Sequence, residues 1–104
     1  MRIYLSGPMT GKPNYNRAAF NAEDYRLSLL GYTTWNPAHL PDGFPYLAYI
    51  AIDLLIMALG RFDVLSMLPG WQSSRGVRIE RWAAWLLGMV IVEADKITSK
   101  GVIK

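Results

Sequence analysis

The sequence has no cysteine among its 104 residues and only one histidine, His39. The lack of cysteine excludes disulfides, thiolate metal sites and a cysteine nucleophile, and it agrees with a reducing compartment such as the cytoplasm. A metal site would have to combine His39 with carboxylates, and a Ser-His-Asp triad would have to use this same histidine, which lies in an expected loop. We therefore expect neither a metal centre nor such a triad.

The sequence also lacks a strong excess of one charge and a long apolar run. Its formal net charge is +3, and its basic residues are scattered except for a loose cluster at 75–81, which favours a small anionic ligand over a nucleic acid. The apolar run at 44–59 is shorter than the about 20 residues that span a bilayer. The chain begins directly with an expected strand, which leaves no room for a targeting peptide. We expect one cytoplasmic domain, residues 1–104, that does not enter a membrane.

Short apolar runs alternate with segments of helical periodicity. We expect strands at 3–5, 32–35, 62–68 and 89–92, and helices at 14–30, 46–59 and 75–87. This order predicts a parallel sheet with right-handed crossovers, so the fold class is α/β: a Rossmann-like or flavodoxin-like three-layer sandwich with a central parallel sheet of four to five strands. The tail at 93–104 leaves two alternatives: residues 101–103 could add a short strand at an edge of this sheet, or this polar segment could be partly disordered.

The two later helices are unusually apolar for a small domain. The helix at 46–59 is apolar all round, which is typical of burial on every side, and the helix at 75–87 carries Trp82, Trp85, Leu86 and Leu87. One face of a sheet cannot hide all of these side chains. We therefore expect a homo-oligomer, a dimer or higher, and the alternative is a poorly soluble monomer.

Two loops follow expected strands, where open parallel sheets bind their ligands. The first contains Ser6, Gly7, Pro8, Met9 and Thr10. The second runs through Pro69, Gly70 and Trp71 to two serines and Gly76, at the start of the third helix. Backbone N–H groups at a helix start favour an anion such as a phosphate, although Ser73 or Ser74 could simply cap the helix.

Three side chains are candidates for chemistry. Glu80 lies early in the third helix and either faces the sheet or is a surface residue beside an arginine. Asp53 is the one charge in an apolar helix, so it needs a partner such as Arg61 or a function. Tyr4 lies in the first strand, where it either reaches the site or packs in the core. The two carboxylates suggest glycosidic chemistry, with one nucleophile and one acid.

On the motifs at 3–11 and 68–71, together with Ser73, Ser74, Arg75, Gly76 and Glu80, the chain resembles the DUF4406 family, common in phages and prophages. That family is similar to nucleoside 2-deoxyribosyltransferases and nucleoside-monophosphate N-glycosidases. The resemblance implies that Glu80 attacks the sugar, that Asp53 assists the leaving base and that Tyr4 positions the nucleophile. It also implies that Ser74 and Gly76 hold a 5′-phosphate, while the loop at 6–10 closes over the sugar.

The expected function is cleavage or transfer of the N-glycosidic bond of a (deoxy)nucleoside or its 5′-monophosphate. Such an N-glycosidase or deoxyribosyltransferase needs no metal or organic cofactor, because a carboxylate nucleophile suffices. Two alternatives stay open: a non-catalytic nucleotide-binding protein with the same loops, and a phage-accessory protein whose apolar helices serve only assembly.

Overall fold

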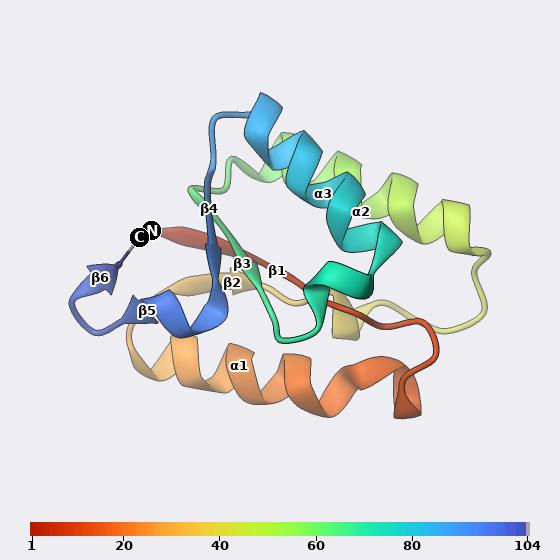
Figure 1. The fold of residues 1–104 in the computed structure, drawn as a ribbon, viewed down its shortest axis with the longest axis horizontal. Coiled ribbons are helices and arrows are strands. Elements are labelled where there is room, and N and C mark those ends of the chain that lie inside the picture. Colours follow the sequence, from red (N-terminus) through yellow and green to blue (C-terminus); the bar gives the residue numbers. More distant parts are fainter. Residues whose placement is uncertain (104) are drawn as a thin grey trace.

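Four parallel strands form the central layer of the molecule, which a computed structural model describes for residues 1–103 (Figure 1). They are β1 (Arg2–Ser6), β2 (Thr33–Trp35), β3 (Val64–Met67) and β4 (Val90–Glu93). Their order across the sheet is β2-β1-β3-β4, and every neighbouring pair is parallel. The expected α/β sandwich with a parallel sheet is confirmed, with four strands in that sheet.

Three helices cover the two faces of this sheet (Figure 1). Helix α1 (Arg17–Leu29) lies on one face, and α2 (Tyr46–Gly60) and α3 (Arg75–Leu86) lie on the other. Short 3-10 turns precede or join these elements: η1 (Pro13–Asn16), η2 (Pro37–His39), η3 (Trp71–Ser73) and η4 (Ala94–Lys96). Right-handed crossovers account for this distribution, because the connection from β1 leads to one side of β1 and the later connections lead to the other.

The side chains of β1 alternate between two cores. Ile3 and Leu5 point toward α1 and pack in a cluster that includes Phe20 and Leu27. Tyr4 points the other way, into a cluster beneath α2 and α3. Because side chains of a strand alternate with a period of two, Ser6 faces the same side as Tyr4. This alternation brings two hydroxyl groups beneath α3.

The C-terminal segment differs from the expectation. Residues Gly101–Val102 form β6, which pairs antiparallel with β5 (Ile97–Thr98) in a separate two-stranded sheet. Residues Gly101–Val102 therefore add no strand to the main sheet, which has four strands, the lower of the two expected numbers. The reason is that η4 turns the chain toward α1, where Ile97 is fully buried and Arg26 donates hydrogen bonds to the carbonyl groups of Ala94 and Ile97. Strand β4 thus remains an edge of the main sheet.

Within the single chain, α2 is not buried on all sides as its sequence suggested. Only Asp53 and Met57 are buried in this helix, while Leu47 is 77% exposed and Leu59 is 73% exposed. A helix that packs on a sheet and beside one neighbouring helix has only one side of its surface covered. No helix within residues 1–103 combines the length and hydropathy needed to cross a membrane.

Candidate functional site

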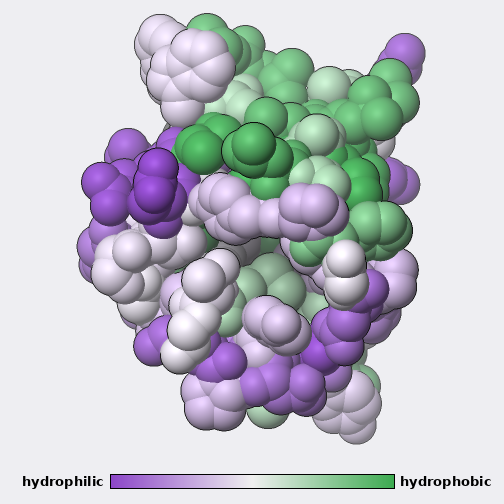
Figure 2. Space-filling model, turned by 90° about the vertical axis from the view of Figure 1, so that its right-hand side faces the viewer, coloured by the Kyte–Doolittle hydropathy of each residue, from purple (hydrophilic) through white to green (hydrophobic). Residues whose placement is uncertain are grey.

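The site lies where the order of the strands reverses, between β1 and β3. In an open parallel sheet the connections from two such strands leave toward opposite sides and open a crevice at their carboxyl ends. A cavity of about 880 Å³ occupies this position. Figure 2 looks onto this end of the molecule, with apolar surface above, over α2 and α3, and mostly hydrophilic residues below, over α1. The described residues around the cavity are 7–10, 12, 15, 17, 37, 40, 42–46, 49, 50, 53, 73–77 and 80.

Glu80 lies at the floor of this cavity, held from below by β1. The Tyr4 hydroxyl donates to Glu80 Oε2 at 2.7 Å, and the Ser6 hydroxyl donates to Glu80 Oε1 at 2.7 Å. Glu80 is only 6% exposed, although it lines the cavity. Because two hydroxyl donors hold both carboxyl oxygens, its orientation is fixed before any ligand binds. The reading of Glu80 as a surface residue is therefore wrong.

Asp53 faces the same cavity from α2. It is 8% exposed, and its Oδ1 atom is buried without a hydrogen-bond partner in residues 1–103. The Tyr4 hydroxyl lies 3.4 Å from the Asp53 carbonyl oxygen, so one tyrosine contacts both acidic residues. No salt bridge joins Asp53 to Arg61 in the described chain, and Arg61 is exposed at the end of α2. A buried carboxyl oxygen without a donor is costly unless a ligand supplies one.

The electrostatics of the floor follow from burial. Burial, with the nearby Asp53 charge, raises the pKa of Glu80 from 4.5 to about 8, although the Ser6 and Tyr4 hydroxyls oppose this shift. Burial also raises the pKa of Asp53 from 3.8 to about 6. The two groups therefore titrate as a pair that retains one proton near neutral pH. The pKa of Tyr4 is raised far above its usual value by burial and by both carboxyl groups, so Tyr4 stays a hydrogen-bond donor.

The rim of the cavity is suited to an anion. Ser74 caps α3, because its hydroxyl accepts a hydrogen bond from the Val77 N–H at 3.3 Å. The start of α3 thus opens onto the cavity with its favourable dipole. Three cationic side chains, Lys12, Arg17 and Arg75, also line the cavity. Of these, Arg17 already contacts Asp42, across the cavity mouth.

An aromatic wall was missed by the sequence analysis. Tyr15, Phe44, Tyr46 and Tyr49 line the cavity. Phe44 and Tyr49 pack edge to face with ring centroids 5.7 Å apart, and the Tyr49 hydroxyl donates to the Pro41 carbonyl at 2.6 Å. The available signal was the cluster of aromatic residues at 44–49, just before an apolar helix. Such a wall offers planar surfaces against which an aromatic ring can stack.

The predicted ligand-binding residues divide into three groups. Gly7, Pro8, Met9, Thr10, Ser74 and Gly76 line the cavity, as expected for the two loops. Ser6 lies beneath it and holds Glu80. Three residues lie outside its lining: Pro69, Gly70 and Trp71. Gly70 instead faces the Pro8 ring, and Trp71 belongs to a different groove beside β4.

Gly7 shows why the first loop needs a small residue. A Cβ atom at Gly7 would lie 2.9 Å from the Leu68 Cβ, which is closer than real Cβ contacts. The glycine therefore allows the turn after β1 to approach the end of β3. Gly7 itself lines the cavity.

No group of three or more His, Asp or Glu residues within 1–103 could hold a metal ion.

Residues 1–93 match the model of a family described as a domain of unknown function, DUF4406, and the chain belongs to this family. No curated protein matches the chain. The family description names no reaction, so a function has to be argued from the site.

Proposed function

We propose that this member of the DUF4406 family cleaves or transfers the N-glycosidic bond of a nucleoside or its 5′-monophosphate. The observation that carries the proposal is the pair of buried carboxyl groups at the cavity floor, with Tyr4 and Ser6 holding both oxygens of Glu80. Glycosidic chemistry uses a carboxylate nucleophile and a nearby acid. The inferred similarity to nucleoside 2-deoxyribosyltransferases agrees with these roles.

In the proposed reaction, a Glu80 oxygen forms a bond to the sugar C1′ while the bond from C1′ to the base nitrogen breaks. The electron pair of that bond stays with the base, which takes a proton from Asp53. Water then attacks C1′, gives its proton to Asp53 and releases Glu80. A second base in the place of water would give transfer instead of hydrolysis.

The raised pKa values explain how the site keeps a proton for the leaving base. In the empty site the pair retains one proton near neutral pH, because burial raises the pKa of both carboxyl groups. Positive charge that develops on the sugar ring favours ionised Glu80, since an opposite charge nearby stabilises a carboxylate. As this charge develops during bond cleavage, the proton of the pair is held on Asp53, from which it reaches the base.

The rest of the cavity suits the remaining parts of such a substrate. The aromatic wall at Phe44, Tyr46 and Tyr49 can stack against a base, and the start of α3 with Ser74 can bind a 5′-phosphate. Lys12 and Arg75 add positive charge at the rim. The Asp53 Oδ1 atom, which has no donor in the described chain, can accept a hydrogen bond from the base.

We also propose that the protein is a homo-oligomer that covers the outer side of α2. Leu47, Leu55 and Leu59 are each more than half exposed and lie on one side of this helix. An uncharged apolar stripe can meet a copy of itself without repulsion between like charges. Light scattering that finds a stable monomer at micromolar concentration would contradict this part of the proposal.

The decisive experiment measures free-base release from a panel of ribonucleosides, deoxyribonucleosides and their 5′-monophosphates. Wild type and Glu80→Ala are compared in parallel, with Glu23→Ala as a control on the opposite face of the sheet. We expect release by wild type and by the control, and none above background by Glu80→Ala. The preferred member of the panel then identifies the base, the sugar and the need for a phosphate.

A folded wild-type protein that releases no base from any member of the panel contradicts the enzymatic proposal. Nucleotide binding is then the remaining function for the cavity. It would show as a rise in melting temperature with ligand concentration, because a ligand that binds only the folded state stabilises it.

A further inference from the structure

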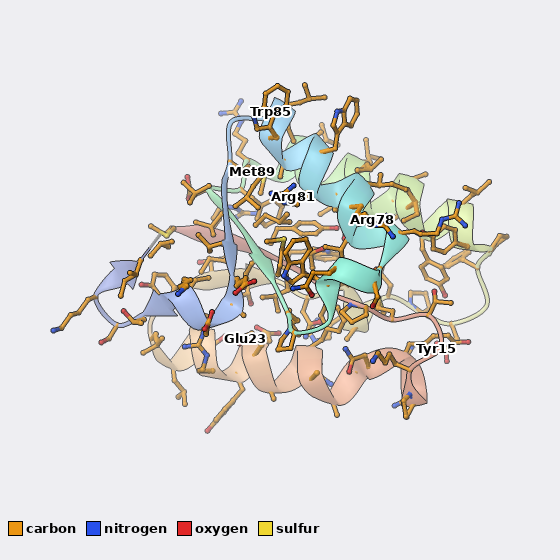
Figure 3. All side chains as sticks on the ribbon, in the orientation of Figure 1. Tyr15, Glu23, Arg78, Arg81, Trp85 and Met89 are labelled. Carbon is orange, nitrogen blue, oxygen red and sulfur yellow. The ribbon has the colours of Figure 1, made fainter. Side chains whose placement is uncertain are left out.

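A second groove lies outside the catalytic cavity, beside the β4 edge of the sheet. Its volume is about 460 Å³. Figure 3 shows α3 lying above β4 at the front of the molecule, with Arg78, Arg81 and Trp85 along this helix. The groove is lined by residues of η3, α3 and β4: Trp71, Arg78, Arg81, Trp82, Trp85 and Ile91. None of them takes part in the proposed reaction.

The backbone of β4 is open along this groove. The strand pairs only with β3, and no described element lies in front of it in Figure 1. The Val90 N–H donates to the Asp63 carbonyl at 2.9 Å. Since backbone groups alternate in direction along a strand, the N–H groups of Ile91 and Glu93 point away from β3. They are free to pair with another strand.

This edge lacks the usual protection against pairing. Natural edge strands carry lysine, proline, a bulge or a covering segment. The sequence of β4, Val-Ile-Val-Glu, has only its last residue charged, and the C-terminal segment turns away to form β5 and β6. Helix α3 therefore lies beside a position in the sheet that residues 1–103 leave unoccupied.

The side chains around the open edge combine tryptophan rings with two arginines, of which Arg81 lies over the Trp71 ring at 5.6 Å. Trp82 is 63% exposed and Trp85 is 70% exposed. Arg78 and Arg81 are exposed, and neither forms an ion pair within the described chain. Glu93, the acidic residue of β4, accepts a hydrogen bond from the Trp71 indole at 3.3 Å. The groove thus favours a partner that brings both apolar and acidic side chains.

We propose that the β4 edge binds an extended acidic segment of a partner protein, which adds to the sheet as a fifth strand. The main chain of this segment would pair with Ile91 and Glu93. Its side chains on the α3 side would lie between the tryptophans, and its acidic groups would pair with Arg78 and Arg81. The positive charge of the two arginines and the position of α3 beside the open edge together favour an extended acidic segment as the partner.

Two other occupants fit less well. If two copies paired antiparallel through β4, their α3 helices would meet on the same face, and the arginines of both copies would face one another without an acid. A single-stranded nucleic acid could stack on the tryptophans, but it has no peptide groups to continue the ladder of the sheet. An extended acidic peptide can pair with the arginines, pack against the tryptophan rings and form hydrogen bonds with the backbone of β4.

The test uses fluorescent peptides in which leucine and glutamate alternate on one face, with threonine between them. A second peptide has lysine in place of each glutamate. Fluorescence anisotropy gives the Kd for wild type, for Arg78→Glu/Arg81→Glu, and for Lys96→Glu/Lys100→Glu, whose change in net charge is the same. Circular dichroism checks that each variant is folded.

We expect the glutamate peptide to bind wild type and the lysine peptide not to bind. The double variant of the groove should weaken binding by about tenfold or more, since paired charges at interfaces carry energies of this size. The Lys96→Glu/Lys100→Glu variant should keep the wild-type Kd. Hydrogen exchange of the Ile91 and Glu93 amides should slow when the peptide binds, which a loose electrostatic contact would not cause.

Five results would overturn the proposal. The first four are absence of binding by the glutamate peptide, equal weakening in both double variants, binding without protection of the β4 amides, and tighter binding of oligothymidylate than of the peptide. The fifth is a dimer that dissociates on Ile91→Lys, because it would assign the β4 edge to a second copy. None of these results depends on whether Glu80 has the proposed catalytic role.

Discussion

The two faces of the sheet contain different kinds of interior. On the α1 face, Phe20 and Leu27 pack against apolar residues of the strands, and Asp24 accepts hydrogen bonds from Thr34 and Asn36. On the α2 and α3 face, two carboxyl groups with raised pKa values lie beneath the helices. Burial of the apolar side chains on the α1 face stabilises the fold. Burial of the two carboxyl groups on the other face destabilises their ionised form. A protein that keeps such groups sacrifices stability for the site.

The largest effect on stability is expected on the α1 face. Leu27→Ala removes a fully buried side chain and should lower the free energy of unfolding by about 2–5 kcal/mol. Leu27 lies outside the cavity, so under the proposed function base release per folded molecule should not change. Chemical denaturation measures the first quantity and steady-state kinetics the second. Leu29→Ala, at a position that is 70% exposed on the same helix, should leave both unchanged.

For Glu80 at the floor of the cavity, we expect a substitution that removes the charge to raise the free energy of unfolding. Glu80 has a pKa of about 8 in the folded protein against 4.5 when exposed, so the folded state holds its proton more tightly. Its contribution to stability is complete below pH 4.5 and is lost as the pH rises through about 8. Glu80→Gln should therefore match wild type in acid and exceed it by a few kcal/mol at alkaline pH.

Denaturation curves at several pH values measure this difference. In Glu23→Gln, on the α1 face, the free energy of unfolding should depend on pH as it does in wild type. If Glu80→Gln is less stable than wild type at alkaline pH, the carboxylate stabilises the fold and the contrast between the two faces fails.

A smaller effect on activity is expected from Tyr4. Tyr4→Phe keeps the ring that packs edge to face on Phe62 but removes the hydroxyl that holds Glu80. Because hydrogen bonds to charged groups contribute about 1.5–3 kcal/mol, kcat should fall by about tenfold to a hundredfold, with KM less affected. An unchanged kcat would mean that Ser6 alone positions the nucleophile.

The smallest effect is expected at the start of α3. Ser74→Ala removes the helix cap and should lower the free energy of unfolding by about 1 kcal/mol. If Ser74 also binds a 5′-phosphate, KM should rise for monophosphates and stay constant for nucleosides. Ser28→Ala is the matched control, because Ser28 lies on α1 outside the cavity, where its hydroxyl donates to Asp24. An equal rise of KM for both substrate classes would exclude a phosphate-specific role.

Much of the fold could be predicted from local patterns. The three helices and the four main strands follow from apolar periodicity and from stops such as Gly31, whose φ is +91°. The boundaries shift by a few residues: α1 begins at Arg17, after a turn in which Asn14, Tyr15 and Asn16 have positive φ. The pairing of residues 101–102 could not be predicted, because a two-residue strand pairs wherever its neighbours bring it.

The candidate site was predictable in its acidic residues and loops. Asp53 stood out because a charge in an apolar helix needs a partner or a function. Glu80 stood out by its place early in the helix that follows the second loop. The aromatic wall and the exclusion of Pro69 and Trp71 from the cavity depend on how the loops turn, and no spacing in the sequence determines that direction.

By itself the sequence determined the alternation of strands and helices, because periodicity and turn residues act within a few positions. It also identified the residue types at the site. Only the tertiary structure decided that Tyr4 and Ser6 bond to Glu80, residues separated by more than 70 positions in the chain. It also decided which apolar side chains stay exposed on α2 and α3, and that β4 keeps a free edge. The physical reason is that burial and pairing depend on every packed neighbour, and most of those neighbours are distant in sequence.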